Sequence, residues 1–156
     1  MRAYLALGSN EGDRPAHLRS AVAGFAEADG VEVVAVSRVY ETDPVGGPAQ
    51  GAFLNAVVAV ETTLDPHALL ALGQALERRA GRLPEGERVR WGPRPLDVDL
   101  LLVGDLTVAS PDLAIPHPRM WERDFVLAPL ADVAPELVDV PAAGWQGVRP
   151  TDVELS

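Results

Sequence analysis

Hydrophobic positions along the chain follow two spacings, and these spacings predict the order of the secondary-structure elements. Four runs rich in β-branched or other apolar residues are bounded by turn residues, which is typical of strands. The last run, LDVDLLLV, is hydrophobic throughout except for Asp97 and Asp99. The predicted strands are residues 3–7, 31–40, 52–62 and 96–103.

Helical spacing of apolar residues accounts for two of the gaps between these strands. Leu18, Val22 and Phe25 recur at helical spacing after Asp13, whose side chain can cap the helix. The second helix begins at Asp65-Pro66, with aspartate at the cap and proline in the first helical position. The resulting order, β-α-β-β-α-β, predicts an α+β fold with a ferredoxin-like core, in which helices pack on an antiparallel sheet.

The part of the chain beyond this core predicts an appended C-terminal region. A hairpin-like stretch at 106–115 is followed by the turn PHPRM and by an apolar helical pattern in DFVLAPLADVAP. A length of 156 residues suits one domain, so we expect residues 1–156 to fold as a single unit.

Two long segments rich in glycine and proline interrupt the regular pattern. They are TDPVGGPAQG at 42–51 and RLPEGERVRWGPRP at 82–95. Connections of this length often have a function, and both segments flank strands with candidate chemistry. We therefore expect them to close over a bound ligand.

Missing residue types and missing apolar runs exclude several classes of protein. The chain has no cysteine, which excludes disulfide scaffolds and thiolate metal sites. It also has no lysine, which excludes a phosphate-binding loop that uses lysine and any lysine Schiff base. No apolar run is long enough for a membrane span or a signal peptide, so we expect a cytoplasmic protein without a membrane partner.

Charge is distributed unevenly along the chain. The net charge of −10 argues against nucleic acid as a partner. Six of the thirteen basic residues nevertheless fall within one segment, which indicates a small anionic ligand held there. A solvated helix end would account for Arg78 and Arg79 but not for Arg94. The six residues are Arg78, Arg79, Arg82, Arg88, Arg90 and Arg94.

The paired aspartates of the last predicted strand are the first candidate site. Asp97 and Asp99 are two residues apart, so their side chains share one face of a strand. Two close carboxylates repel each other unless they are protonated or bridged by a cation. Mg²⁺ favours carboxylates together with substrate phosphates. The alternative is a solvated strand end without a metal, and the D-x-D pattern alone does not separate the two.

The preceding segment favours the metal interpretation. Arg94 lies three residues before Asp97, and its guanidinium suits bidentate phosphate binding. Arg82 belongs to the same loop. Trp91 can cover a flat ring or shield the chemistry from water, although a tryptophan is also a common core residue. Carboxylates, arginines and an aromatic ring together are typical of a Mg²⁺–nucleotide site.

Two further groups of residues are candidates for ligand binding. Phe53 and Asn55 share a strand face, where a ring and an amide can recognise a flat heterocycle, although ordinary packing is the simpler interpretation. His117 lies on a turn between two prolines and can donate to phosphate, and Arg123 and Phe125 follow it. On the second predicted helix, Gln74 and Glu77 share a face that a solvated surface would explain equally well.

These motifs, in this order, resemble the 6-hydroxymethyl-7,8-dihydropterin pyrophosphokinases of folate biosynthesis. The resemblance rests on LALGSN, YETDPVG, FLNAV, RWGPRPLDVDLL, IPHPRM and FVLAPL, which span about residues 3–136. It implies a ferredoxin-like α+β core with mobile loops, and transfer of a pyrophosphoryl group from ATP to the pterin hydroxymethyl oxygen with release of AMP. ATP and the pterin are then the expected partners, with no obligate protein partner.

The resemblance also implies roles for individual residues. Asp97 and Asp99 would hold two Mg²⁺ ions, and Arg82 and Arg94, with Trp91, would close over the reacting phosphates. The remaining roles are binding roles, with some contacts made by the backbone. The pterin would contact Thr42, Val45, Phe53, Asn55, Trp91 and Phe125, and ATP would contact Gln74, Glu77, Arg94, His117 and Arg123.

The chain departs from the family pattern at several positions. Many relatives have tyrosine where Phe53 stands, and an arginine where Pro84 stands. Arg88 or Arg90 is the candidate to replace that arginine. Some relatives have arginine and threonine where Asp112 and Ala114 stand.

Two other functions remain open on the residues alone. A regulatory ferredoxin-like module that binds a small ligand explains the ring and the amide but gives the paired aspartates no role. A different Mg²⁺-dependent transferase could use D-x-D for a sugar nucleotide. Ferredoxin-like scaffolds have many functions, so the fold does not decide between them.

Overall fold

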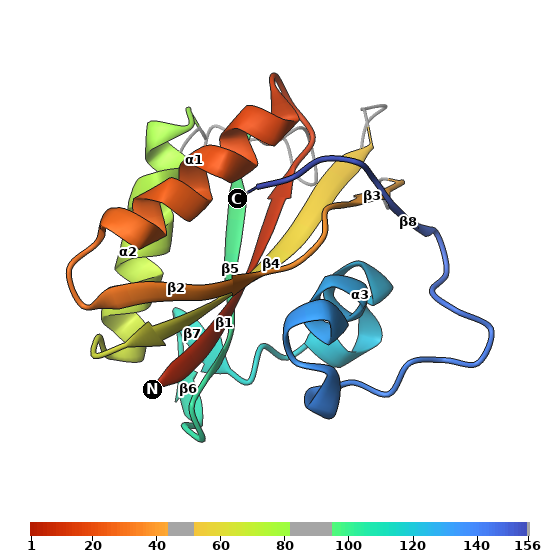
Figure 1. The fold of residues 1–156 in the computed structure, drawn as a ribbon. Helices are drawn as coiled ribbons and strands as arrows, with labels where there is room; N and C mark the ends of the chain where they lie inside the picture. Colours follow the sequence, from red (N-terminus) through yellow and green to blue (C-terminus); the bar gives the residue numbers. More distant parts are fainter. Residues whose placement is uncertain (44–51, 82–94, 156) are drawn as a thin grey trace.

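The computed structural model describes residues 1–43, 52–81 and 95–155, and Figure 1 gives their arrangement. Nearly all of the two predicted loops therefore lies outside the described residues. None of the helices within these ranges has the length and the apolar character that crossing a membrane requires. The elements are β1 (Arg2–Ser9), α1 (Arg14–Glu27), β2 (Val31–Val36), β3 (Tyr40–Thr42), β4 (Phe53–Thr62), α2 (Pro66–Arg79), β5 (Asp97–Val103), β6 (Val108–Ser110), β7 (Leu113–Ile115), η2 (Met120–Glu122), α3 (Asp124–Val133), η3 (Pro135–Leu137) and β8 (Val148–Pro150).

Six of the strands form one sheet, in the order β5-β1-β4-β3-β8, with β2 also paired to β4. The pairs are antiparallel, and β2 and β3 lie one after the other along the same edge of β4. This arrangement confirms the predicted ferredoxin-like order. β6 and β7 form a separate hairpin, as the stretch at 106–115 predicts.

The two faces of the sheet are covered differently. α1 and α2 pack on one face, where Phe25 and Leu69 join the main hydrophobic core. α3 packs on part of the opposite face, with Val126 and Leu130 in a second, smaller core (Figure 1). The remainder of that second face, at the ends of β1, β4 and β5, carries the polar residues described below.

The predicted strand 31–40 is two strands, so predicting it as continuous was wrong. At Ser37 the backbone N–H donates to the Val57 carbonyl (2.9 Å), and the Ser37 Oγ accepts from the Val57 N–H (2.8 Å). The register also shifts between Val33 and Ala35. The serine hydroxyl thus takes a hydrogen bond that a backbone carbonyl would take in a regular ladder. Because the Ser37 hydroxyl competes with the backbone for this hydrogen bond, β2 ends at Val36, before Tyr40.

Side-chain caps explain where the two core helices begin. The Asp13 carboxylate accepts from the Ala16 N–H at 3.1 Å, and the Asp65 carboxylate accepts from the Ala68 N–H at 2.8 Å. Both caps were predicted from the sequence. At the other end of α2, Gly81 has a φ of 94°, a left-handed conformation that glycine adopts readily after a helix.

Candidate active site

The strand order brings the two most informative sequence motifs onto one face of the sheet. Gly8 on β1 is the Cα partner of both Asn55 on β4 and Asp97 on β5. Ala6, two residues earlier on β1, is the partner of Asp99. Partners in an antiparallel ladder project to the same face. The amide motif and the carboxylate motif are therefore separated only by the width of β1.

Asp97 and Asp99 are half-buried, whereas the residues between and after them are buried. Val98 and Leu100 are 8% and 4% exposed and belong to the core under α1 and α2. The two carboxylates project from the other face, as the alternation along a strand requires. Val98 and Leu100 therefore anchor β5 in the core, and the two carboxylates lie on the opposite face of the sheet.

Asn55 is held in one orientation by its neighbour on β3. Its Nδ2 donates to Thr42 Oγ1 at 2.7 Å, and both residues are buried. Because Nδ2 is occupied by Thr42, the Oδ1 acceptor faces away from β3, toward β1. Phe53, on the same face, is half-buried beside this amide. The pair offers a hydrogen-bond acceptor and an aromatic ring to a ligand.

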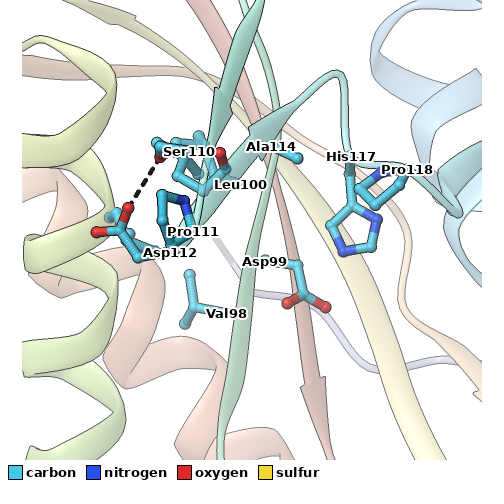
Figure 2. Close-up of a pocket in the computed structure, with 11 residues that line it drawn as sticks. Val98, Asp99, Leu100, Ser110, Pro111, Asp112, Ala114, His117 and Pro118 are labelled. Carbon is cyan, nitrogen blue, oxygen red and sulfur yellow. Dashed lines mark hydrogen bonds between the residues drawn. The ribbon is translucent and has the colours of Figure 1, made fainter.

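His117 lies beside β5 because its backbone N–H donates to the Leu101 carbonyl at 3.0 Å. Figure 2 shows its ring and the Asp99 carboxylate on the same side of the strand. Its Nδ1 accepts from the Arg119 backbone N–H at 3.3 Å, so in the neutral ring the proton belongs on Nε2. Burial, together with the charge of Arg123, lowers the pKa of His117, which Asp97 opposes. A neutral ring donor is the result at pH 7.

The start of α3 contributes a cation and a ring. The Arg123 guanidinium carbon lies 5.5 Å from the centre of the Phe125 ring, a cation–π distance. The positive charge of Arg123 also lowers the pKa of His117, so the two side chains lie near each other. The structure thus places Arg123 beside the Phe125 ring and close enough to His117 to act on its pKa, as Asp97 also does.

α2 approaches the same strand from the other side. Glu77 Oε2 accepts from the Val98 backbone N–H at 2.8 Å, directly between the two aspartates. Gln74 is exposed, three residues before Glu77 on the same helical stripe. The hydrogen bond to Val98 means that Glu77 supports the strand, a role that the sequence did not predict.

A cavity of about 300 Å³ lies along β5 between α2 and the β6–β7 hairpin. Asp99 and His117 line one part of it (Figure 2). Leu70, Leu100 and Pro111 supply apolar walls. Asp112 and Ala114, two positions at which the chain departs from the family pattern, also line it. Ser110 donates to the Asp112 carboxylate at 2.9 Å, and this bond and one to His67 lower the pKa of Asp112.

Several predicted site residues lie outside the described residues. They are Val45, Arg82, Trp91 and Arg94, together with Pro84, Arg88 and Arg90.

Two residues near the site were not identified from the sequence. Gly8 lies between Asn55 and Asp97. The predicted strand 3–7 ends before Gly8, whereas β1 continues to Ser9, so no signal in the sequence indicated that this glycine lies inside the sheet. Arg14 donates to the Ala52 carbonyl at 2.7 Å and contacts Glu41 at 3.4 Å. It thereby fixes the start of β4, but a lone arginine at a helix start gives no signal of such a contact.

Comparisons with known proteins show the family to which the chain belongs. A family model described as 7,8-dihydro-6-hydroxymethylpterin-pyrophosphokinase matches residues 4–135. The Bacillus subtilis 2-amino-4-hydroxy-6-hydroxymethyldihydropteridine pyrophosphokinase is 50% identical over 135 residues, which cover 86% of this chain and 79% of that protein. The protein of the same name from Pseudomonas aeruginosa is 43% identical over 136 residues, covering 87% of this chain and 82% of that protein.

Solved structures support the fold. A crystal structure of HPPK-DHPS in complex with substrates matches with a TM-score of 0.65 and 15% sequence identity. The match covers 86% of this chain but only 40% of that longer protein. At this identity the likeness concerns the fold alone.

Proposed function

The chain belongs to the 7,8-dihydro-6-hydroxymethylpterin-pyrophosphokinase family, and from this premise we propose which of its residues perform the reaction. The activity is that of a pyrophosphokinase of folate biosynthesis, which transfers pyrophosphate from ATP to 6-hydroxymethyl-7,8-dihydropterin and releases AMP. One observation carries the assignment of residues. Asn55 and Phe53 share a sheet face with Asp97 and Asp99, across the single strand β1.

Asp97 and Asp99 hold two Mg²⁺ ions in this proposal. Among the described residues there is no cluster of three or more histidine, cysteine, aspartate or glutamate side chains that could form a complete metal cage. A pair of carboxylates fits Mg²⁺ that arrives with a nucleotide, since this ion keeps waters and phosphate oxygens as its other ligands. When bound, Mg²⁺ supplies positive charge that offsets the charge of the phosphate oxygens.

The pterin lies at the β3–β4 end of this face. The Asn55 Oδ1 accepts a hydrogen bond from an N–H on the ring edge, while Thr42 holds the amide by its other end. Phe53 and Phe125 stack on the two faces of the ring, and they come from β4 and α3 respectively. Val45 and Trp91, outside the described residues, complete the pterin site in this proposal.

The nucleotide lies along β5. Its base occupies the cavity between α2 and the hairpin, where Leu70 and Leu100 provide apolar contacts. His117 donates to phosphate through Nε2, and Arg123 supplies a guanidinium beside it. Gln74 and Glu77 contact the nucleotide from α2 in this proposal, and Glu77 also accepts from the Val98 backbone N–H. Arg82 and Arg94 are proposed to bind the phosphates.

The chemical step joins the two sites. The pterin hydroxymethyl oxygen forms a bond to the β-phosphorus of ATP, and the bond from that phosphorus to the α–β bridging oxygen breaks. AMP leaves with the bridging oxygen, and the hydroxyl proton is released to water. A reaction of this type needs positioning and charge stabilisation more than a dedicated base. Asp97 and Asp99 hold the phosphate end in place, while Asn55 and the rings orient the acceptor.

The proposed metal ligands can be tested by product analysis with MgATP and 6-hydroxymethyl-7,8-dihydropterin. Asp97→Asn or Asp99→Asn should lower kcat by at least ~100-fold, since phosphate charge is then left uncompensated. Asp105→Asn is a matched control, because Asp105 is an exposed aspartate just beyond the other end of β5. Near-wild-type turnover by both site variants would refute the metal assignment, and ADP as product would refute the reaction.

A cytoplasmic location, the absence of nucleic-acid and membrane partners and the absence of an obligate protein partner stay predictions from the sequence.

A further inference from the structure

We propose that Gly8 determines which acceptors the enzyme can use, because the missing side chain leaves an open trough between the amide and the carboxylates. The inference rests on the proposed function and adds a residue to it. The occupant is the flat heterocyclic acceptor, which must reach from Asn55 to the phosphate held at Asp97. Gly8 lies beneath that path on β1.

The backbone does not explain the glycine. Gly8 is not among the described glycines with a positive φ, so its conformation is open to any residue. A glycine inside a strand costs roughly 0.5–1 kcal/mol relative to alanine. A strand that accepts this cost without a conformational need indicates that space is required at this position.

Space at position 8 is limited by the residues that recognise the ligand. A Cβ on Gly8 would lie 3.1 Å from Asn55 Oδ1 and 3.7 Å from Phe53 Cδ1. It would therefore project among the side chains assigned to the pterin and lie beside the amide oxygen that accepts from the ring. Ala6, the preceding residue on the same face, is also small, so β1 carries short side chains at the two positions that lie opposite Asp97 and Asp99.

The distance across β1 from Asn55 to Asp97 matches the length of the acceptor. Neighbouring strands lie about 4.8 Å apart, so Asn55 and Asp97 are separated by roughly 10 Å across Gly8. A bicyclic ring with a one-carbon arm can cover this span only if it lies close to β1. Any side chain at position 8 lifts the ring and withdraws the hydroxymethyl oxygen from the phosphate.

The test is a size series at position 8, with Gly8→Ala and Gly8→Val compared with wild type. For Gly8→Ala we expect kcat/KM for 6-hydroxymethyl-7,8-dihydropterin to fall at least tenfold, and further for Gly8→Val. The Kd of α,β-methylene ATP in the presence of Mg²⁺, measured by calorimetry, should stay within twofold of the wild-type value, because the nucleotide lies on the other side of Asp97. Thermal unfolding of each variant reports whether it is folded.

Gly73→Ala is the matched control. Its Cβ would lie 3.0 Å from Val98 Cγ1, an equally tight contact, but on the helix-covered face of the sheet. We expect its kcat/KM for the pterin to stay near the wild-type value. If a folded Gly8→Ala variant keeps kcat/KM within twofold, or loses nucleotide binding to the same extent, the inference is wrong. Failure of the wild-type protein to form product would instead refute the proposed function.

Discussion

At the scale of single residues, the contact between Thr42 and Asn55 decides which end of the amide meets a ligand. The 2.7 Å hydrogen bond from Asn55 Nδ2 uses the donor end, and both side chains are buried. An amide with no such partner could turn over and present a donor where an acceptor is needed. Thr42 is therefore a positioning residue for pterin recognition in the proposed site.

Thr42→Val tests this role, since it replaces the hydroxyl with a methyl group of similar size. The buried Asn55 donor then lacks its partner, which should lower the free energy of unfolding by about 1–3 kcal/mol. We also expect a higher KM for the pterin and an unchanged KM for MgATP in steady-state kinetics. Thr42→Ser keeps the hydroxyl and should restore pterin binding. Equal pterin KM values for the valine and serine variants would contradict the role.

At the scale of elements, α3 is tied to β3 and to the segment before β3 by a cluster of polar side chains. The Tyr40 hydroxyl donates to Asp132 Oδ2 at 2.9 Å, and Arg38 makes a bidentate contact with the same carboxylate. Asp132 is near the end of α3, and Arg123 and Phe125 are at its start. The cluster thus fixes the helix that presents two proposed ligand-binding residues.

The Tyr40 contact predicts a pH dependence of stability. Burial and the hydrogen bond to Asp132 raise the pKa of Tyr40 to about 12, above the ordinary value of 10.0. Because the folded-state value is the higher one, the contribution is complete below pH 10 and is lost as the pH rises toward 12. Tyr40→Phe should lower the free energy of unfolding by about 1.5 kcal/mol at pH 8.

Urea unfolding of wild type and Tyr40→Phe at several pH values between 8 and 11 measures this dependence. The difference between the two proteins should be constant up to about pH 9.5 and should shrink above pH 10. A difference that stays constant up to pH 11 would show that the hydroxyl is not held in the protonated form by the folded structure.

The order of the elements was predictable, but their contacts were not. Asp13 and Asp65 cap helices as predicted, because a cap depends only on residues three positions away. The shared face of Asp97 and Asp99 also follows from one strand alone. The register that sets them across β1 from Asn55 depends on pairing between strands far apart in the sequence, which no local pattern encodes. Similarly, the break at Ser37 arises from a hydroxyl that contacts a residue twenty positions away.

At the scale of the whole molecule, the C-terminal tail is part of the sheet and of the core. The family model ends at residue 135, whereas β8 pairs with β3 and places Val148 opposite Thr42. Arg149 lies 3.5 Å from Glu41 and 3.2 Å from Asp43, at the border of the proposed pterin site. Leu155 is 8% exposed in the main core. The tail therefore supports the edge of the sheet on which Thr42 lies.

We propose that residues 1–156 form one domain that includes this tail, and Leu155→Ala tests it. Loss of the buried side chain leaves a cavity in the main core and should lower the free energy of unfolding by about 2–4 kcal/mol. If the tail belongs to the same cooperative unit, one transition shifts, and tryptophan fluorescence and far-ultraviolet circular dichroism report the same midpoint.

Glu154→Ala is the matched control for the tail. Its side chain is exposed, and the backbone carbonyl that accepts from Arg19 Nε at 2.9 Å is retained. Its stability should therefore stay within about 0.5 kcal/mol of wild type. If Leu155→Ala is equally stable, the tail contributes nothing to the core. If it instead separates the two signals into two transitions, the tail folds as a unit of its own, and β3 must be held at the sheet edge by its pairing with β4.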